Sequence, residues 1–116
     1  MANPNVQYQL VTGNWAHVDG DQLVRPSGYL LFSPDPEGLP RYWATTIGSV
    51  RALVDAGVLR DIQDRVGVYL AAFVDGVPIR WTAEIHELKW NGQPVATGDP
   101  ITFDPNTDGV HLTAVH

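Results

Sequence analysis

Turn-forming residues recur along this chain and leave only short apolar segments between them. The clearest turn dipeptides are Asp19-Gly20, Asp75-Gly76 and Asn91-Gly92. Asp-Gly and Asn-Gly favour the backbone conformations that a two-residue β-hairpin loop requires. Short apolar segments bounded by such turns are typical of β-strands. The spacing therefore predicts an all-β chain.

The strongest single strand signal lies between residues 79 and 86. Apolar residues occupy every odd position of this segment, and polar or charged residues occupy every even one. A period of two puts one face of a strand in the core and the other in water, as in an antiparallel sheet. We therefore expect Trp81 and Ile85 to be buried. The residues that we expect to be exposed are Arg80, Glu84 and His86.

Residues 48–59 are ambiguous, because their apolar positions fit both a helical face and a strand. Asp55-Ala56-Gly57 would make a tight turn and favours a hairpin, while a short helix near residues 59–65 stays open as an alternative. Further strands are expected at residues 6–10, 28–34, 41–47, 68–74, 101–103 and 110–115. These seven or eight strands would bury their apolar faces most simply in an antiparallel two-sheet sandwich.

Length, charge and cysteine content narrow the class of protein. A chain of 116 residues, 44% of them hydrophobic, fits one globular domain over residues 1–116. The net charge of −6 disfavours binding to nucleic acid or to an anionic membrane surface. Residues 1–5 have neither a basic nor an apolar stretch and no apolar run reaches about 20 residues, so we expect neither a secretory signal nor a membrane-spanning segment. With no cysteine, disulfides and thiolate metal sites are excluded.

One segment resembles a metal-binding loop. Residues 104–109 (DPNTDG) match the first half of an EF-hand calcium loop, but Val115 stands where the closing bidentate glutamate would be. Such residues also make ordinary turns between strands, which is the reading we favour. The four histidines do not have the spacing of a metal site. They are His17, His86, His111 and His116. We expect no metal and no cofactor.

Catalytic motifs are also missing from the sequence. No serine lies in the G-x-S-x-G frame of a nucleophilic serine. The phosphate-binding glycine motifs G-x-x-x-x-G-K-[ST] and G-x-G-x-x-G do not occur either. Most aspartates fall in predicted turns, where turn chemistry explains them without acid–base catalysis. We therefore expect a protein that binds or assembles and is not an enzyme, with no catalytic residue.

The aromatic residues are the candidates for a binding surface. Trp81 falls on the apolar face of its strand, whereas Trp15, Trp43 and Trp90 lie close to turns or strand ends. An exposed indole can stack on a sugar or anchor a protein interface, although these rings could also cap the open ends of a sandwich. Tyr42 and Trp43 follow a proline-rich loop at residues 35–40, whose restricted backbone would favour docking. The candidate interface or ligand surface comprises Trp15, Tyr42, Trp43 and Trp90.

Taken together, these motifs resemble a known family. Val11, Gly13 and Trp15, then the Asp19-Gly20 turn, then residues 27–34 (SGYLLFSP) are similar to the opening of small β-sandwich modules. Those modules occur in minor tail proteins of long-tailed phages that infect actinobacteria. Residues 50–59 (VRALVDAGVL) resemble the hairpin that follows in the modules. Residues 68–75 and 81–87 resemble their next two strands, whereas residues 61–65 depart from the pattern.

The resemblance implies a transthyretin-like or immunoglobulin-like sandwich without enzymatic activity, located in a virion. It covers roughly residues 10 to 90, and no functional residue carries over. We therefore expect a phage virion structural protein, a minor tail or tail-tip component that packs against other virion proteins and forms a homo-oligomer within the particle. The alternatives are a capsid decoration protein and a carbohydrate-binding module that contacts a host-surface glycan.

Overall fold

The computed structural model describes residues 6–35, 48–105 and 110–115, and over these residues the chain is all-β. None of the described residues forms a helix, so none forms a helix long and apolar enough to cross a membrane. The eleven strands of the described residues are β1 (Val6–Asp19), β2 (Gln22–Val24), β3 (Ser27–Pro34), β4 (Val50–Asp55), β5 (Val58–Arg60), β6 (Val68–Val74), β7 (Val77–Pro78), β8 (Trp81–Trp90), β9 (Gln93–Pro94), β10 (Ile101–Phe103) and β11 (His111–Val115).

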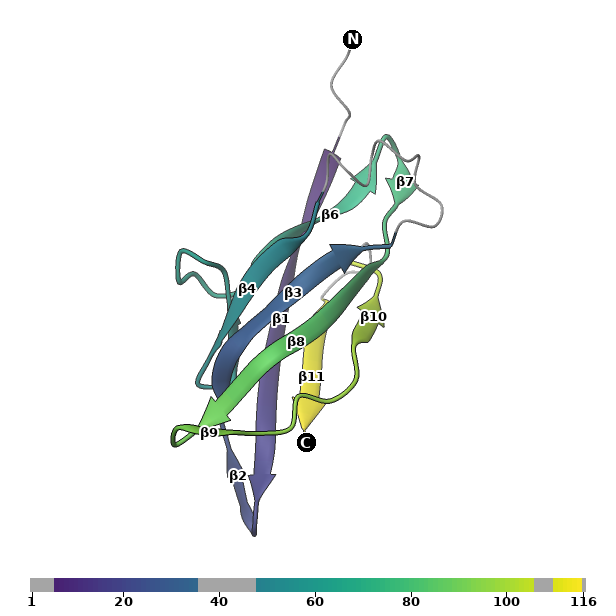
Figure 1. The fold of residues 1–116 in the computed structure, drawn as a ribbon. Helices are drawn as coiled ribbons and strands as arrows, with labels where there is room; N and C mark the ends of the chain where they lie inside the picture. Colours follow the sequence, from purple (N-terminus) through teal and green to yellow (C-terminus); the bar gives the residue numbers. More distant parts are fainter. Residues whose placement is uncertain (1–5, 36–47, 106–109, 116) are drawn as a thin grey trace.

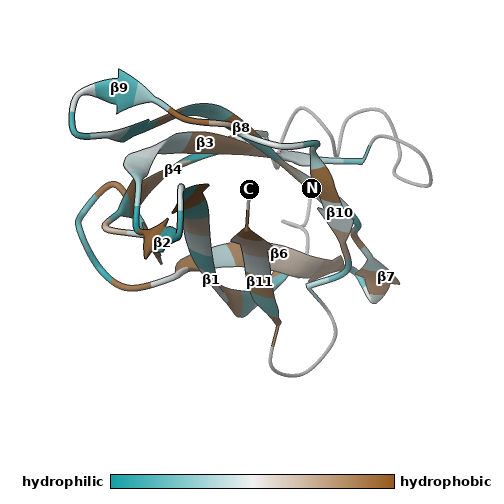
Figure 2. Cartoon of the chain, turned by 90° about the horizontal axis from the view of Figure 1, so that it is seen from below, coloured by the Kyte–Doolittle hydropathy of each residue, from teal (hydrophilic) through white to brown (hydrophobic). Residues whose placement is uncertain are grey.

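The strands form two layers that face each other across the core (Figures 1 and 2). One layer runs in the order β10-β8-β3-β4-β5, and the other is built from β1 with β6, β7 and β11. The long strand β1 joins the layers, because its Asn14 pairs with Val58 of β5 while its first half pairs with β6. The predicted β-sandwich is therefore confirmed. The strand pairs among the described residues are antiparallel, except that β11 runs parallel to β1.

Two of the three predicted dipeptides form two-residue hairpin loops, whereas Asp19 of the third pairs with Gln22, so that Gly20 and Asp21 are the central residues of that turn. Asp75 and Gly76 have φ angles of 49° and 79°, and Asn91 and Gly92 have φ angles of 50° and 75°. Positive φ at both central residues is the geometry of the favoured two-residue hairpin loop. Each of these turns adds a two-residue arm, β7 or β9, to the longer strand before it. Together with the three-residue strand β2, these short arms bring the described strands to eleven, above the seven or eight that we expected.

The ambiguous segment forms a hairpin of β4 and β5, with positive φ at Ala56 and Gly57 in its turn. The alternative helix near residues 59–65 does not form. Instead, Asp61 Oδ1 accepts hydrogen bonds of 2.9 Å from the backbone N–H groups of Gln63 and Arg65. These bonds, that of Arg65 above all, lower the pKa of the Asp61 carboxyl. The predicted strand at residues 41–47 lies outside the described residues.

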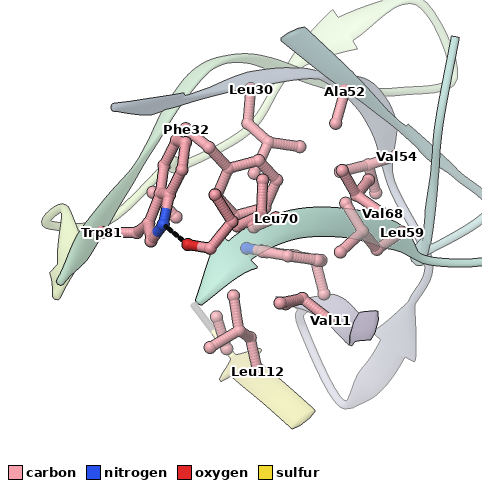
Figure 3. Close-up of a cluster of buried hydrophobic side chains, with 14 of the residues drawn as sticks. Val11, Leu30, Phe32, Ala52, Val54, Leu59, Val68, Leu70, Trp81 and Leu112 are labelled. Carbon is pink, nitrogen blue, oxygen red and sulfur yellow. Dashed lines mark hydrogen bonds between the residues drawn. The ribbon is translucent and has the colours of Figure 1, made fainter. Parts of the chain in front are cut away.

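The core contains two fully buried indoles, Trp15 and Trp81. Trp81 Nε1 donates a hydrogen bond of 2.8 Å to the Ala71 carbonyl, and the ring lies beside Phe32 (Figure 3). Around them the two layers contribute aliphatic side chains that form one cluster. The predicted burial of Trp81 is thus confirmed, as is the predicted exposure of the polar residues. These exposed residues are Arg80, Glu84 and His86.

Ile85 is only partly buried, although it packs against the core. The reason is an irregularity in the pairing of β3 with β8, where Tyr29 pairs with Glu87 and Leu30 pairs with Ile85. His86 is therefore an extra residue in β8, and the alternation changes there, so that Leu88 is the next fully buried side chain. A strict period of two predicts the first half of this strand and fails beyond the bulge.

Candidate functional site

Trp15 is not part of any surface, which corrects the expectation from the sequence. Its side chain is 0% exposed and belongs to the core cluster. A Cβ at Gly13 would lie 2.7 Å from Trp15 Cζ3, so the indole covers the backbone of that glycine. The alternation of Val11, Gly13 and Trp15 is therefore a packing motif, in which glycine makes room for the ring. That register is the signal that could have placed Trp15 in the core.

Tyr42, Trp43 and residues 36–40 of the proline-rich loop lie outside the described residues. Their role in an interface stays a prediction. Of the four candidates, Trp90 is thus the residue that the structure describes on the surface, where it is partly exposed.

Trp90 lines a cleft at one end of the sandwich, which we call the end cleft. Its volume is ≈ 370 Å³, and it lies between the end of β1 and the hairpin of β8 and β9, which approach the same end of the molecule in Figure 1. The residues that define the end cleft are His17, Asp19, Trp90, Asn91, Gln93, Pro94 and Val95. It combines one indole with a carboxylate, two amides and an imidazole.

Local hydrogen bonding fixes both walls of the end cleft. On one wall Trp90 pairs with Gln93 across the Asn91-Gly92 turn, and the Val95 N–H donates a 2.9 Å hydrogen bond to the Leu88 carbonyl beyond it. On the other wall His17 pairs with Val24, and Asp19 pairs with Gln22. The His17 Nδ1 atom is enclosed and has no hydrogen-bond partner among the described residues.

A second surface feature is apolar. Tyr8 and Leu10 point outward from β1, and Tyr69 lies directly opposite Leu10 on β6, with exposed fractions of 63%, 36% and 64%. Val66 is 55% exposed, and the Leu10 side chain reaches over the neighbouring Gly67. We call Tyr8, Leu10, Val66 and Tyr69 the outer patch. The sequence gives one indication of this patch. Residues 68–70 are three consecutive apolar or aromatic residues, and because successive residues of a strand face opposite sides of the sheet, some of these side chains must face outward.

The hairpin of β1 and β2 carries a further exposed apolar pair. Val18 and Leu23 lie opposite each other in the register and are 50% and 56% exposed. Figure 1 shows this hairpin extending beyond the two layers as an arm. Two-stranded ribbons are only marginally stable in water, and this exposed pair adds little buried apolar area to the arm.

The outer face of the other layer carries a stack of three side chains. The Tyr29 ring stacks on His86, with centroids 5.8 Å apart, and the Arg51 guanidinium carbon lies 4.6 Å from the Tyr29 centroid. Together with Leu31 these side chains border a shallow hollow of ≈ 200 Å³. Because Arg51 already covers the tyrosine, the ring is engaged within the chain and offers little face to a ligand.

The calcium-like segment begins at Asp104, whose Oδ1 lies 3.2 Å from Arg80 Nε. Residues 106–109 of that segment lie outside the described residues. Within the described part of the chain, no three His, Asp or Glu side chains gather closely enough to hold a metal ion.

We expect calcium to leave the melting temperature unchanged at concentrations below about 1 mM, since Arg80 engages the first carboxylate and Val115 cannot close the loop. Thermal melts with calcium and with a chelator would measure this. A chelator-dependent shift of more than a few degrees would contradict it, and an Asp108→Asn variant would show whether this loop was the cause.

Comparison with protein-family models, with curated proteins and with solved structures finds no match for this chain. A function for the chain is therefore inferred from its own residues and from the motifs that they form.

Proposed function

We propose that this chain is a structural protein of a phage virion, a minor tail or tail-tip component that acts by packing against neighbouring proteins. Two independent features support the proposal. The first is the series of motifs over residues 11–34 and 50–87, which resembles the tail-protein modules. The second is the exposed apolar surface of the outer patch, which carries the assembly part of the proposal.

The outer patch suits contact with another copy of the same chain. Exposed apolar groups that cluster on one face of a soluble protein mark interaction sites more often than single exposed residues do. The chain has a net charge of −6, so copies repel each other, and this repulsion opposes contact least where the touching surfaces carry no charge. Tyr8, Leu10 and Tyr69 carry no charge, and a two-fold contact would bring these same side chains together. Tyrosine is also enriched at the centres of interfaces.

Location in a virion is tested on particles. Phage particles would be produced from the genome that encodes this chain, purified and analysed by mass spectrometry. They should contain the chain in a fixed ratio to the other virion proteins. An antibody label viewed by electron microscopy should mark the tail. A label on the head would replace the tail assignment with a decoration protein, and absence of the chain from purified particles would refute the virion proposal.

Self-association tests the outer patch. In sedimentation velocity experiments, the wild-type chain should form dimers or larger species as its concentration rises. A variant with Leu10→Ser and Tyr69→Ser should stay monomeric, with the dissociation constant for self-association raised tenfold or more. The reason is that it lacks two apolar side chains that the contact would bury.

Ile62→Ser is the matched control, since Ile62 is 69% exposed and is not one of the residues of the outer patch, although it shares the loop between β5 and β6 with Val66. It should associate like the wild type. A wild-type chain that is monomeric at every concentration, or a double variant that associates normally, would rule out this contact.

A further inference from the structure

The end cleft has the chemistry of a saccharide site, and the proposed packing role does not use it. We propose that the end cleft binds one neutral sugar residue of a glycan, with the Trp90 indole against the sugar ring. This binding is a property of the isolated chain and does not rest on the virion proposal.

The first argument is the combination of groups. A pyranose has a face of C–H groups and a rim of hydroxyls, each of which both donates and accepts hydrogen bonds. Trp90 supplies a flat apolar surface, while the Asn91 and Gln93 amides donate and accept and the Asp19 carboxylate accepts. Ligand sites commonly combine an aromatic wall with a few placed polar groups in about 300–1,000 Å³, and the end cleft with ≈ 370 Å³ falls at the small end of that range.

The second argument is an unused hydrogen-bonding atom. His17 Nδ1 is enclosed and has no partner among the described residues, yet its side chain lines the cleft. A polar atom that is shielded from water without a partner destabilises the folded chain, and such atoms in native proteins call for an explanation. Because the Nδ1 atom is enclosed, a sugar hydroxyl in the cleft would reach it only after a small rotation of the imidazole, and it would then donate or accept according to the tautomer of the ring.

Charge points to a neutral sugar. Asp19 lines the cleft, Asp21 is exposed in the turn that follows, and the chain as a whole carries a charge of −6. Lys89, which precedes Trp90 on β8, lies 3.1 Å from the Glu87 carboxylate and is already paired. A sugar that carries a carboxylate or sulfate would therefore be repelled, whereas a neutral one would not.

The site is also held in place before any ligand arrives. Asn91 has a φ of 50° in the two-residue turn, and the pairing of Trp90 with Gln93 fixes the strand on each side of it. A wall formed by such a turn loses little conformational freedom on binding, so more of the contact energy appears as affinity.

The test uses the full chain labelled with ¹⁵N and titrated with the methyl glycosides of glucose, galactose, mannose and N-acetylglucosamine. At about 50 mM, each would occupy most sites even if the dissociation constant were several millimolar. At least one neutral glycoside should shift the Trp90 indole N–H signal, assigned through Trp90→Phe, in a saturable way. Methyl glucuronide, matched in shape to the glucoside but anionic, should bind at least tenfold more weakly.

Trp90→Ala and Asp19→Asn should each weaken binding tenfold or more while the remaining amide spectrum keeps its dispersion, which shows that the variant is folded. Tyr69→Ala, an exposed aromatic of the outer patch, should bind sugar normally and serves as the control. The saccharide site is refuted if no glycoside shifts the Trp90 signal, or if binding survives Trp90→Ala. If the Tyr69 variant binds sugar normally but is no longer incorporated into particles, assembly depends on the outer patch and sugar binding does not. The two proposals can therefore fail independently of each other.

Discussion

Replacing Trp81 by alanine is expected to lower the free energy of unfolding by about 3–5 kcal/mol, the usual cost of deleting a large buried ring. The side chain is 0% exposed and lies between the two layers. Its removal also takes away the 2.8 Å hydrogen bond to the Ala71 carbonyl and leaves that buried oxygen without its partner. For a domain stabilised by about 5–15 kcal/mol this is a large share, so the variant should unfold at far lower urea concentration.

Trp81→Phe separates the two contributions. Phenylalanine keeps an aromatic ring in the core but cannot donate to Ala71, so the loss should be smaller than for alanine, about 1–3 kcal/mol. Urea denaturation of the three proteins, followed by far-ultraviolet circular dichroism, measures both steps. An alanine variant as stable as the wild type would show that the described packing of this strand is wrong.

Gly28→Ala should be nearly as damaging, although it adds only one methyl group. A Cβ at this position would overlap the Glu87 carbonyl oxygen and would lie 2.6 Å from the carbonyl carbon. These are backbone atoms of the neighbouring strand and cannot move aside as a side chain can. Gly28 pairs with Leu88 on one side and with Val54 on the other, so a shift would disturb three strands of the layer. We expect a loss of about 3 kcal/mol or more, at the upper end for overpacking.

Gly20→Ala is the matched control for that loss. Gly20 has a φ of 65°, and nothing lies within 4 Å of the position that an added methyl group would take, so only the left-handed backbone conformation opposes alanine there. Its cost should be about 1–2 kcal/mol. Thermal or urea unfolding of both variants would test the comparison. If Gly28→Ala costs no more than Gly20→Ala, the close approach of β3 to β8 is not as described.

The parts of the fold that the sequence predicts are those with local causes. Asp75-Gly76 and Asn91-Gly92 form hairpins because two adjacent residues alone set the required positive φ angles. The burial of Trp81 follows from strict alternation within its own strand. Even the ambiguous residues 48–59 are resolved by a local signal, the turn at Ala56 and Gly57.

The features that escape prediction depend on residues far apart in the chain. Trp15 lies near a predicted strand end, and its alternation with Val11 and Gly13 becomes informative only because β1 continues through it. The core cluster that buries the indole includes residues as distant in the chain as Leu112. The end cleft requires the end of β1 to meet the hairpin after β8, and neither segment alone indicates the other. The same holds for β11, whose pairing with β1 joins residues about a hundred positions apart.

That last pairing has a mechanical consequence. The strands β1 and β11 run parallel over five register pairs, from Thr12 with His111 to Ala16 with Val115. Tension that pulls Val6 and Val115 apart would slide one strand lengthwise along the other. The evenly spaced hydrogen bonds of a parallel pair would then bear the load together and not open one after another. Because forced unfolding is governed by the unfolding rate and not by equilibrium stability, we expect this pairing to resist tension between Val6 and Val115 more strongly than a hairpin that opens one hydrogen bond at a time.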